Sequence, residues 1–342
     1  MELLVLASGS GGHVYPALSF IDYAKKSETI TYLQLKNGFE TRFKLDGVTS
    51  ITMDLPNQFK KYIKNPMNFK KMHQEIKRYK HTLKRVDAVI CFGGFVSFLG
   101  LVIAKKYHKP LFLHEQNSSL GDGNGVASLF AKKVFTTFEL SNPKIINKKF
   151  MNLGNPRMDD AKNKNFYINK KDFNVLFFAG SLSSSSLNKI VKDLFERNFP
   201  INMHFYLISG EKQKDYFAKL KSSQVEVITY QEDMLKLMNN MDLVIMRGGA
   251  TSLSEVIALN KPAIIIPSPN VKHNHQKKNV ELIQKADACV MIEEKNLSSE
   301  LLFKNIMKLY SDHDLRVKLK SNLSKFNRFD VSKYMLEAIK NG

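Results

Sequence analysis

The stretch Arg247–Asn279, RGGATSLSEVIALNKPAIIIPSPNVKHNHQKKN, combines a glycine turn, a hydroxyl cluster, one acid, an apolar run and a polar tail. Its pattern predicts a loop, a helix that begins at Ala250-Thr251-Ser252, a strand over Ala263–Pro267 and a second polar loop. Because both loops follow strands, they are expected at the carboxyl edge of a parallel sheet, where open α/β folds bind ligands. Hydroxyls and backbone N–H groups at a helix start suit a phosphate, and Glu255 suits sugar hydroxyls. The stretch therefore predicts a nucleotide-sugar site.

The same alternation of apolar runs and helical patterns extends along the whole chain. Most runs are too uniformly apolar for a one-sided antiparallel sheet and fit strands that are buried on both faces. Helical patterns lie between them, which predicts an α/β fold with parallel sheets. The predicted strands are Leu3–Ala7, Ile30–Gln34, Ala88–Phe92, Pro110–His114, Lys133–Thr137, Val175–Ala179, His204–Ser209, Val225–Thr229, Leu243–Met246, Ala263–Pro267 and Ala288–Ile292.

The chain also divides into two halves, since 342 residues exceed one compact core and suit two domains. The first half ends near the turn Gly154-Asn155-Pro156, and the polar stretch Asp159–Asp172 separates it from the next strand. The hinge is expected near residues 157–165. Two doubly wound, Rossmann-like domains are expected on either side of a ligand cleft, over residues 1–157 and 165–325.

The last stretch, Asp312–Gly342, is helical by pattern. Residues 326–342 are expected to pack back toward the first domain. The apolar positions that carry the helical pattern are Leu315, Leu319, Leu323 and Phe326.

Composition narrows the class of protein. A hydrophobic content of 43% supports packed cores. Cys91 and Cys289 lack metal-ligand spacing and are interpreted as small buried hydrophobes in a reducing compartment. Met1–Ala7 is too short for a signal peptide and contains Glu2, and no run approaches the roughly 18–20 apolar residues of a membrane span. A cytosolic protein that can lie on a membrane surface is expected.

The net charge of +20 admits nucleic acid, anionic lipid or phosphorylated substrates as partners, and a lysine-rich composition bias explains part of it. The most basic segment is 59–85, where Glu75 is the sole acid. Its early part interleaves apolar side chains with lysines, which favours an anionic membrane surface. A merely solvated face and nucleic acid are the alternatives. The interleaved apolar residues are Phe59, Tyr62, Ile63 and Met67; those expected to face the core at helical spacing are Phe69, Met72, Ile76, Tyr79 and Leu83.

Two glycine loops follow predicted strands of the first half. In ASGSGGH, residues 7–13, Gly11 and Gly12 let backbone N–H groups approach an anion at a helix start, with a structural turn as the alternative. The spacing differs from the dinucleotide fingerprint, so a redox role is disfavoured. His13 at the mouth of this loop is a candidate general base, although a lone histidine is more often structural. The second loop, FGGFVS with Gly93 and Gly94, is interpreted beside the first as further anion-binding surface, with a structural turn as the alternative.

The polar run His114-Glu115-Gln116-Asn117 ends another buried strand. Four polar side chains that can form hydrogen bonds or transfer protons are hard to explain by solvation alone at such a position. Glu115 or Asn117 is expected to bind sugar hydroxyls or to orient a base.

The second half begins with a comparable loop, Ala179–Ser183, in which Ser181 is expected to donate to a phosphate. A flexible serine loop is the alternative. Arg157, beside the interdomain turn, either pairs with a surface acid or reaches the nucleotide. Gln231 follows the strand Val225–Thr229 and is expected to contact the nucleobase of the nucleotide.

Taken together, these motifs resemble the MurG family, which adds N-acetylglucosamine to the lipid-linked muramoyl-pentapeptide of peptidoglycan synthesis. The resemblance covers nearly the whole chain, and HEQN and the Arg247–Asn279 segment are its most specific parts. The motifs, in order, are GSGGHVYPAL, FGGFVS, HEQN, GNPR, GSL and RGGATSLSE with the HQKKN tail.

The resemblance implies the GT-B fold and an inverting transfer from UDP-N-acetylglucosamine (UDP-GlcNAc) to lipid-linked N-acetylmuramoyl-pentapeptide. It implies no cofactor and no essential bound metal, and a peripheral location on the inner face of the cell membrane. His13 and Glu115 carry over as catalytic residues. The substrate-binding residues that carry over are Ser10, Gly11, Gly12, Gly93, Gly94, Asn117, Arg157, Ser181, Gln231, Ala250, Thr251, Ser252, Leu253, Ser254, Glu255, Gln276 and Asn279.

The family's roles divide these residues between the two substrates. Asn117 would hold the N-acetylglucosamine hydroxyls and Gln276 would meet the same sugar. Arg157, Ser181 and Gln231 would contact the UDP moiety, and Glu255 would bind the ribose hydroxyls.

The chain departs from the family pattern in three loops. Phe98-Leu99-Gly100 follows FGGFVS, Ser183-Ser184 ends the second-domain loop, and Leu120–Asn124 replaces a proline-glycine turn after HEQN. These departures concern the acceptor more than the nucleotide. The alternatives are a glycolipid synthase that moves a hexose from a UDP-sugar to diacylglycerol, and a non-catalytic relative that binds membrane or nucleic acid.

Overall fold

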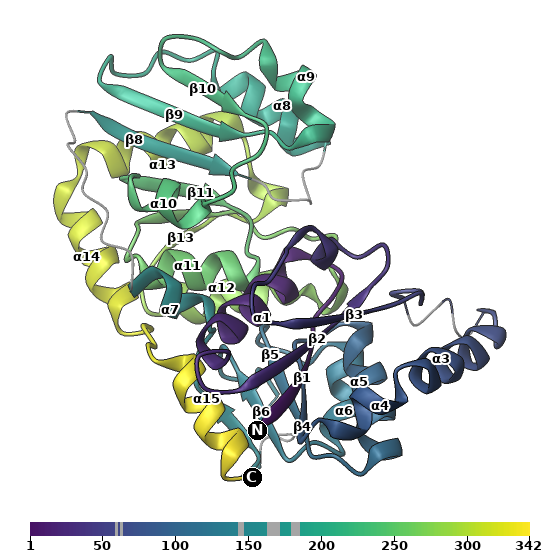
Figure 1. The fold of residues 1–342 in the computed structure, drawn as a ribbon. Helices are drawn as coiled ribbons and strands as arrows, with labels where there is room; N and C mark the ends of the chain where they lie inside the picture. The colour runs from purple at the N-terminus through teal and green to yellow at the C-terminus, as the bar shows by residue number, and fades with distance from the viewer. Residues whose placement is uncertain (59–60, 62–63, 143–146, 163–171, 179–184) are drawn as a thin grey trace. The chain divides into compact units, whose positions relative to one another are not determined.

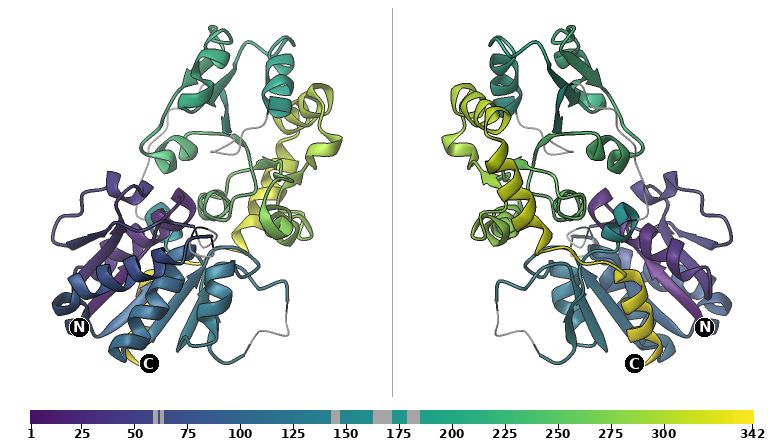
Figure 2. Two further views of the ribbon diagram at one scale, coloured as in Figure 1. Left: turned by 90° about the vertical axis from the view of Figure 1, so that its right-hand side faces the viewer. Right: turned by 90° about the vertical axis from the view of Figure 1, so that its left-hand side faces the viewer.

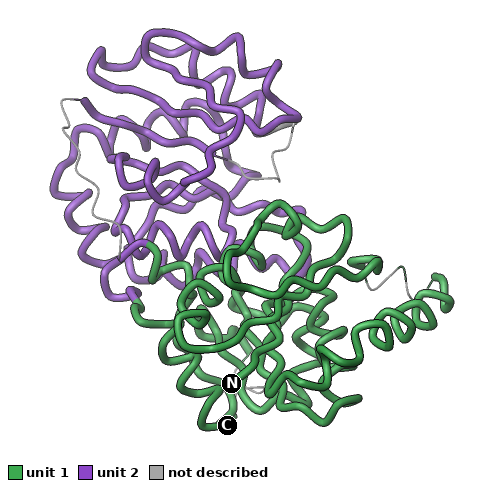
Figure 3. Tube along the Cα trace, viewed as in Figure 1, with its two compact units in different colours: residues 1–160, 328–342 green, residues 161–327 purple. Residues whose placement is uncertain are grey.

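The computed structural model describes the chain except residues 59–60, 62–63, 143–146, 163–171 and 179–184. Two compact units make up the chain (Figure 3). Unit 1 comprises Met1–Asp160 together with Arg328–Gly342, and unit 2 comprises Ala161–Asn327. Each unit is built on a sheet whose described strands all run parallel, which confirms the predicted α/β class.

The sheet of unit 1 has seven strands in the order β3-β2-β1-β4-β5-β6-β7. Strand β1 pairs with β2 on one side and with β4 on the other, so the strand order reverses beside it. The loops that follow β1 and β4 therefore meet at a topological switch point, where α/β sheets bind ligands. The strands are β1 (Glu2–Leu6), β2 (Thr29–Leu35), β3 (Thr49–Met53), β4 (Ala88–Cys91), β5 (Leu111–Glu115), β6 (Lys133–Thr136) and β7 (Phe150–Asn152).

Alternate residues of the unit 1 strands enter two different cores, which explains their uniform apolarity. Leu4 and Leu6 of β1 belong to one core, and Leu3 and Val5 belong to the other. The last helix, α15, packs on α1 and β6 within this unit (Figure 2). The helices are α1 (Gly11–Ala24), η1 (Phe39–Arg42), α3 (Met67–Arg78), α4 (Lys80–Arg85), α5 (Phe95–Tyr107), α6 (Asp122–Ser128), α7 (Arg157–Lys162, which ends in unit 2) and α15 (Val331–Lys340).

The sheet of unit 2 has six strands in the order β10-β9-β8-β11-β12-β13, with its switch point between β8 and β11. The strands are β8 (Phe173–Phe178), β9 (Met203–Ile208), β10 (Val225–Ile228), β11 (Leu243–Met246), β12 (Ala263–Ile265) and β13 (Val290–Met291). The helices are α8 (Ser185–Leu194), η4 (Glu211–Gln213), α9 (Lys214–Ala218), α10 (Met234–Asn239), α11 (Ala250–Ala258), η5 (Lys272–Asn274), α12 (His275–Gln284), η6 (Glu294–Asn296), α13 (Ser299–Ser311) and α14 (His313–Ser324).

Strands β3 and β7 were absent from the sequence prediction. In β3 only Ile51 and Met53 are buried, so the strand alternates and lacks the uniform apolar run that marks a central strand. Strand β7 spans only Phe150–Asn152, too short to give a clear pattern. Both are edge strands of the unit 1 sheet, so among the described strands each pairs with a single neighbour.

The terminal stretch is helical, as expected, and consists of two helices, α14 and α15, with a turn between them that includes Asp330, whose φ is 61°. One further expectation needs correction. In the basic segment, Met72, Ile76 and Leu83 are buried as expected, but Phe69 is 38% exposed and does not face the core. Helix α3 extends away from the sheet of unit 1, which leaves the start of the helix without core to pack against (Figure 1).

Candidate functional site

The first glycine loop joins β1 to the amino terminus of α1. Gly9 has a φ of 102°, and α1 begins at Gly11 directly after Ser10, whose exposed side chain makes no cap hydrogen bond. A β-carbon on Gly11 would lie 2.9 Å from the Tyr15 ring, so the aromatic side chain packs directly over the backbone here. The loop thus presents backbone at the start of a 14-residue helix, a geometry that suits an anion.

His13, on the first turn of α1, is held through one ring nitrogen. Its Nδ1 lies 2.8 Å from Oε1 of Gln116, and its side chain is half-buried. Gln116 follows β5 and is 2% exposed. Its Nε2 lies 3.0 Å from Nδ1 of His114, whose own Nε2 lies 3.1 Å from the carbonyl oxygen of Gly154. A continuous chain of polar contacts therefore connects the Gly154 backbone to the His13 ring.

His114 in the middle of this chain is fully buried. Burial lowers the pKa of His114 to about 4, although its hydrogen bond to Gly154 acts in the opposite direction. The ring is consequently neutral at neutral pH. A neutral imidazole has one N–H donor and one acceptor nitrogen, which matches the two contacts that it makes.

The second glycine loop gives His13 the space that it occupies. Gly93 has a φ of 88°, and a β-carbon there would lie 2.8 Å from Nδ1 of His13 and 3.1 Å from Oε1 of Gln116. Gly94, with a φ of 74°, precedes α5, and a β-carbon on Gly123 would lie 2.0 Å from the Gly94 carbonyl oxygen. The FGGFVS loop is therefore packed tightly between His13 and α6.

The carboxylate of Glu115 organises the loop that follows HEQN. Its Oε1 accepts hydrogen bonds from the backbone and side-chain nitrogens of Asn117, at 3.0 and 3.2 Å. Its Oε2 accepts from the Gly121 backbone at 3.0 Å and from the Asn124 side chain at 2.8 Å. The carboxylate is 2% exposed, so its observed contacts orient Asn117 and the 117–124 loop. The catalytic assignment of Glu115 stays a prediction.

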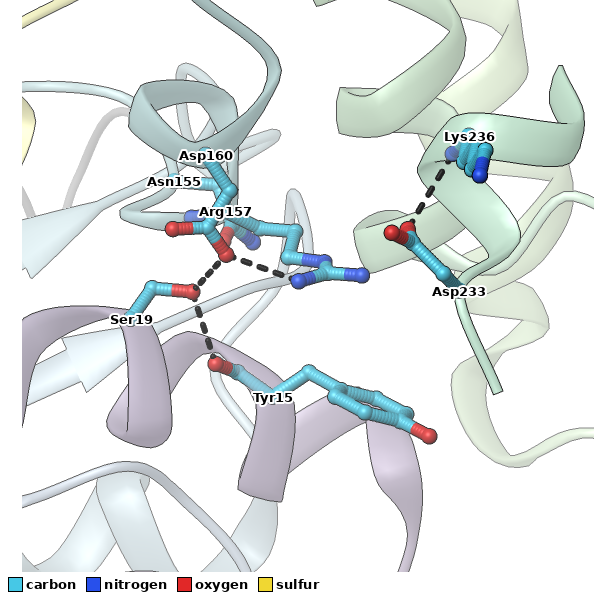
Figure 4. Close-up of polar contacts among 7 residues, drawn as sticks. All are labelled: Tyr15, Ser19, Asn155, Arg157, Asp160, Asp233 and Lys236. Carbon is cyan, nitrogen blue, oxygen red and sulfur yellow. Dashed lines mark hydrogen bonds and ion pairs between the residues drawn. The ribbon is translucent and has the colours of Figure 1, made fainter. Parts of the chain in front are cut away.

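Arg157 begins α7 and is clamped within unit 1 (Figure 4). Its Nη1 donates to Asp160 at 2.7 Å, and its guanidinium carbon lies 5.1 Å from the centre of the Tyr15 ring. The Ser19 hydroxyl donates to the same Asp160 oxygen at 2.7 Å. The carboxylate and the aromatic face together restrict the guanidinium. Of the two interpretations offered for Arg157, pairing with an acid is observed; contact with a nucleotide stays a prediction.

In unit 2, α11 begins at Ala250, as predicted, directly after the glycine turn. Leu253 and Ser254 are fully buried, and the Ser254 hydroxyl donates to the Ala250 carbonyl oxygen within the helix. Thr251 and Glu255 are 7% and 5% exposed, whereas Ser252 is half-buried. Helix α11 follows β11 next to the switch point of the unit 2 sheet, the position at which a doubly wound sheet binds ligands.

The polar tail of the Arg247–Asn279 segment connects the two loops at this edge. Gln276 and Asn279 lie on α12 and are almost fully buried. Gln276 Oε1 accepts from the Ser268 backbone at 2.8 Å, and Asn279 donates to the Gly248 carbonyl oxygen at 3.4 Å. A β-carbon on Gly248 would lie 2.8 Å from the Gln276 carbonyl oxygen, so this turn requires glycine. The two loops therefore form one connected structure.

Buried Arg247 anchors the same turn from the other side. It donates to the Ile266 carbonyl oxygen at 3.2 Å and forms a 2.7 Å ion pair with Glu294. Gln231 lies after β10 and donates to the Asp233 carbonyl oxygen at 3.3 Å. Asp233 in turn caps α10 by accepting from the Lys236 backbone at 3.1 Å (Figure 4). Ser181 and Ser183-Ser184 lie outside the described residues.

Several residues that contact the predicted site residues were not themselves predicted. Gln116 was noticed only as a member of HEQN, although the period of two in an extended segment puts it on the same side as His114. Asn124 was noticed only within a loop departure, yet it bonds both His114 and Glu115. Tyr15 has no local signal, because its partner Arg157 is distant in sequence, whereas Asp160 lies three residues from Arg157 and its i,i+3 spacing is a local signal for this pair.

The chain matches two family models, the glycosyltransferase family 28 N-terminal domain over residues 3–136 and the family 28 C-terminal domain over residues 174–333. It is 30% identical to the UDP-N-acetylglucosamine--N-acetylmuramyl-(pentapeptide) pyrophosphoryl-undecaprenol N-acetylglucosamine transferase of Limosilactobacillus reuteri, over 99% of this chain and 98% of that protein. The protein of the same name from Bacillus cytotoxicus is 32% identical, over 90% and 89% of the two chains.

The fold is similar to that of Acinetobacter baumannii MurG, with a TM-score of 0.77 and 22% identity over 100% of this chain and 99% of the other. A putative UDP-N-acetylglucosamine 2-epimerase from Listeria monocytogenes has a TM-score of 0.72 at 12% identity, over 99% and 96% of the two chains. These likenesses support the GT-B fold. Because both family models match and the two curated relatives are 30% and 32% identical over at least 90% of this chain, the chain belongs to glycosyltransferase family 28 and, within it, to the MurG family.

Proposed function

We propose that this chain is a glycosyltransferase that moves N-acetylglucosamine from UDP-GlcNAc to lipid-linked N-acetylmuramoyl-pentapeptide. The observation that carries the proposal is membership of the MurG family over nearly the full chain, with relatives named for this reaction at 29–32% identity. The buried polar networks at the carboxyl edges of both sheets support it, because a binding site needs ordered polar groups.

The donor nucleotide is assigned to unit 2. The amino terminus of α11, with Ala250, Thr251 and Ser252, would receive the diphosphate, since a helix start offers N–H donors and a favourable dipole. Glu255 would bind the ribose hydroxyls and Gln276 the sugar. Leu253, Ser254 and Asn279 would complete the donor site of this unit, and Ser181 and Gln231 are assigned to it on the family resemblance.

The acceptor and its activation are assigned to unit 1. His13 would take the proton from the acceptor hydroxyl as that oxygen attacks the anomeric carbon of the donor. The new carbon–oxygen bond replaces the bond from that carbon to the β-phosphate, and the electron pair leaves on UDP. The substrates would contact the two glycine loops at Ser10, Gly11, Gly12, Gly93 and Gly94. Asn117, oriented by Glu115, would hold the hydroxyls of the transferred N-acetylglucosamine.

The leaving diphosphate gains negative charge in this step. Two kinds of group would stabilise this charge, the helix starts at the sheet edges and the guanidinium of Arg157. Arg157 is already held by Asp160 and Tyr15, so little reorganisation is needed when a phosphate arrives. This preorganisation favours a role for Arg157 toward UDP.

We also propose that unit 1 binds an anionic membrane surface through the 59–85 region and the end of α6, which would locate the enzyme on the inner face of the membrane. Met67 and Phe69 on α3 are exposed among lysines, as are Leu129 and Phe130 after α6. Lys105 lies 3.3 Å from the centre of the Phe130 ring, so charge and apolar surface adjoin. Across the described residues, every helix is too short or too polar to span a bilayer.

Labelled UDP-GlcNAc and UDP-glucose, each offered with lipid-linked muramoyl-pentapeptide and with diacylglycerol, test the reaction. Product is expected with UDP-GlcNAc and the muramoyl lipid. Transfer of glucose to diacylglycerol would instead establish a glycolipid synthase, and absence of transfer in all four combinations would refute the proposal.

Co-sedimentation with phosphatidylglycerol vesicles, against phosphatidylcholine vesicles, tests the membrane surface. Phe69→Ser is expected to weaken sedimentation with the anionic vesicles. Val317→Ser on α14, which is also exposed, is the matched control and should leave it unchanged. Equal effects of the two substitutions would remove α3 from the membrane contact.

A further inference from the structure

The buried chain of contacts that ends at His13 determines more than the position of the ring. We propose that Gln116 is a positioning residue that holds His13 in one tautomer, with the proton on Nδ1 and the lone pair on Nε2. This inference rests on the proposed function of His13 as the base, and it deepens that function by naming the nitrogen that reacts. Gln116 itself is buried behind the ring and acts through it.

The orientation of the Gln116 amide follows from its backbone neighbours. One amide atom lies 3.2 Å from the Phe92 carbonyl oxygen and 3.3 Å from the His114 carbonyl oxygen. Since carbonyl oxygens only accept hydrogen bonds, this atom must be the nitrogen, Nε2. The amide oxygen is thereby directed at His13, 2.8 Å from its Nδ1.

His114 supports the same orientation from the other end. Its Nε2 faces the Gly154 carbonyl oxygen at 3.1 Å, so this nitrogen carries the proton. Burial holds the pKa of His114 near 4, which leaves the ring neutral and its Nδ1 unprotonated. That nitrogen can only accept, and the Gln116 amide nitrogen lies 3.0 Å away as its donor. The protonation state of each group is therefore consistent with that of the next.

The tautomer of His13 is the last step of this chain. Its Nδ1 meets an amide oxygen that can only accept, so Nδ1 carries the proton and Nε2 has the lone pair. When Nε2 takes a proton from the acceptor hydroxyl, the Nδ1 hydrogen bond remains and stabilises the imidazolium. A neutral amide does this without a second buried charge, which a carboxylate at the same place would introduce.

Gly93 provides the space in which the ring lies. A β-carbon built on Gly93 would lie 2.8 Å from His13 Nδ1, so a larger residue there would displace the ring. Gln116 can therefore select the tautomer only because the glycine allows the ring this close approach.

Nitrogen-15 spectra of histidine-labelled protein test the tautomer directly, with the His13→Gln variant used to assign the His13 signals. In the wild-type protein above pH 7, His13 is expected with Nδ1 protonated and Nε2 unprotonated. The opposite tautomer, or an even mixture, would overturn the proposal whatever the activity. This readout needs no substrate, so it remains decisive even if the transfer reaction is not observed.

Two variants separate positioning from packing. Gln116→Met keeps the side-chain length but removes the acceptor, and it should give a tautomer mixture and a kcat lowered about 10-fold or more, with KM for UDP-GlcNAc within about 3-fold. Gln116→Glu keeps an oxygen toward Nδ1. Its other oxygen faces the Phe92 and His114 carbonyl oxygens, so we expect this acid to fold protonated and to restore the Nδ1-protonated tautomer and part of kcat.

A purely structural role for Gln116 gives a different result. It would lower the melting temperature of both variants while the His13 tautomer stayed as in the wild type, and this would overturn the proposal. If Gln116→Met does not fold, the wild-type spectrum and the Gln116→Glu variant still decide it, because the proposal requires the same tautomer in both.

Discussion

The guanidinium of Arg157 lies 2.7 Å from the carboxylate of Asp160, one helical turn away on α7. The side chains of Arg157 and Asp160 are 13% and 28% exposed, and Tyr15 covers the guanidinium with its ring. Most surface ion pairs contribute little, but one held by an aromatic face and a second donor is better ordered. The pair therefore gives Arg157 a fixed direction before any ligand binds.

Asp160→Asn should weaken UDP binding by about 3- to 10-fold, because the ion pair that orients Arg157 becomes a weaker hydrogen bond from the guanidinium to a neutral amide. Titration calorimetry with UDP measures this effect. Asp287→Asn, which removes the exposed ion pair of Asp287 with Lys318 in unit 2, is the matched control and should leave the affinity unchanged. Equal affinities of Asp160→Asn and wild type would show that the clamp does not serve the nucleotide.

His13→Ala should lower kcat by about 10²- to 10⁴-fold, the range that a general base contributes. The affinity for UDP should change little, because the role of His13 is toward the acceptor hydroxyl. Steady-state kinetics and UDP calorimetry on the same preparation separate the two effects. Turnover like that of the wild type would remove His13 from the base role.

Glu255→Ala should act mainly on the nucleotide. Hydrogen bonds to a carboxylate contribute about 1.5–3 kcal/mol each, so loss of the ribose contact should raise the Kd for UDP by at least about 10-fold. Glu300→Ala, which removes an exposed carboxylate on α13 of the same unit, is the matched control and should leave the affinity unchanged. Unchanged UDP affinity in Glu255→Ala would refute the ribose assignment.

Gly93→Ala should separate backbone strain from a steric effect on His13. Gly47, with a φ of 74° and open space around its Cα, is the matched control for Gly93, whose φ is 88°. Both alanine variants should lose about 1–2 kcal/mol of stability from the left-handed backbone. Only Gly93→Ala should also lower kcat, by about 10-fold or more, since its methyl group would displace the His13 ring. Parallel melting curves and kinetics check this, and equal kcat in the two variants would contradict it.

His114 should make unit 1 less stable in mild acid. Its pKa falls from 6.5 in the unfolded chain to about 4 in the fold, so the unfolded chain binds the proton first. The corresponding stability is present above pH 6.5 and is lost as the pH falls from 6.5 through 4, by at most about 3 kcal/mol. Urea unfolding followed by circular dichroism at pH 7 and pH 4.5 measures it.

His114→Gln is the control for this pH effect. The variant will be less stable at both pH values, but its stability should change less between them than that of the wild type. An identical change in the two proteins would assign the acid sensitivity to other groups.

Local patterns in the sequence determined the fold class and the boundaries that matter most. Uniform apolar runs identified the central strands because these are buried on both faces, and the glycine turn correctly predicted the start of α11 at Ala250. The edge strand β3 has no uniform apolar run and was not predicted, because its Thr49, Ser50 and Thr52 are exposed. Phe69 fitted the helical period, yet tertiary structure left the start of α3 without a core to cover it.

The same distinction between local pattern and tertiary structure applies to the candidate site. The sequence by itself determined which segments carry chemistry, since HEQN and the Arg247–Asn279 segment combine reactive side chains with strand ends. Only the tertiary structure decided what each side chain does. Gln116 meets His13 across 103 residues of sequence, and Asp160 meets Ser19 across 141. Such contacts arise because parallel strands bring their carboxyl ends to one edge of the sheet, and a local pattern contains no information about which distant loop arrives there.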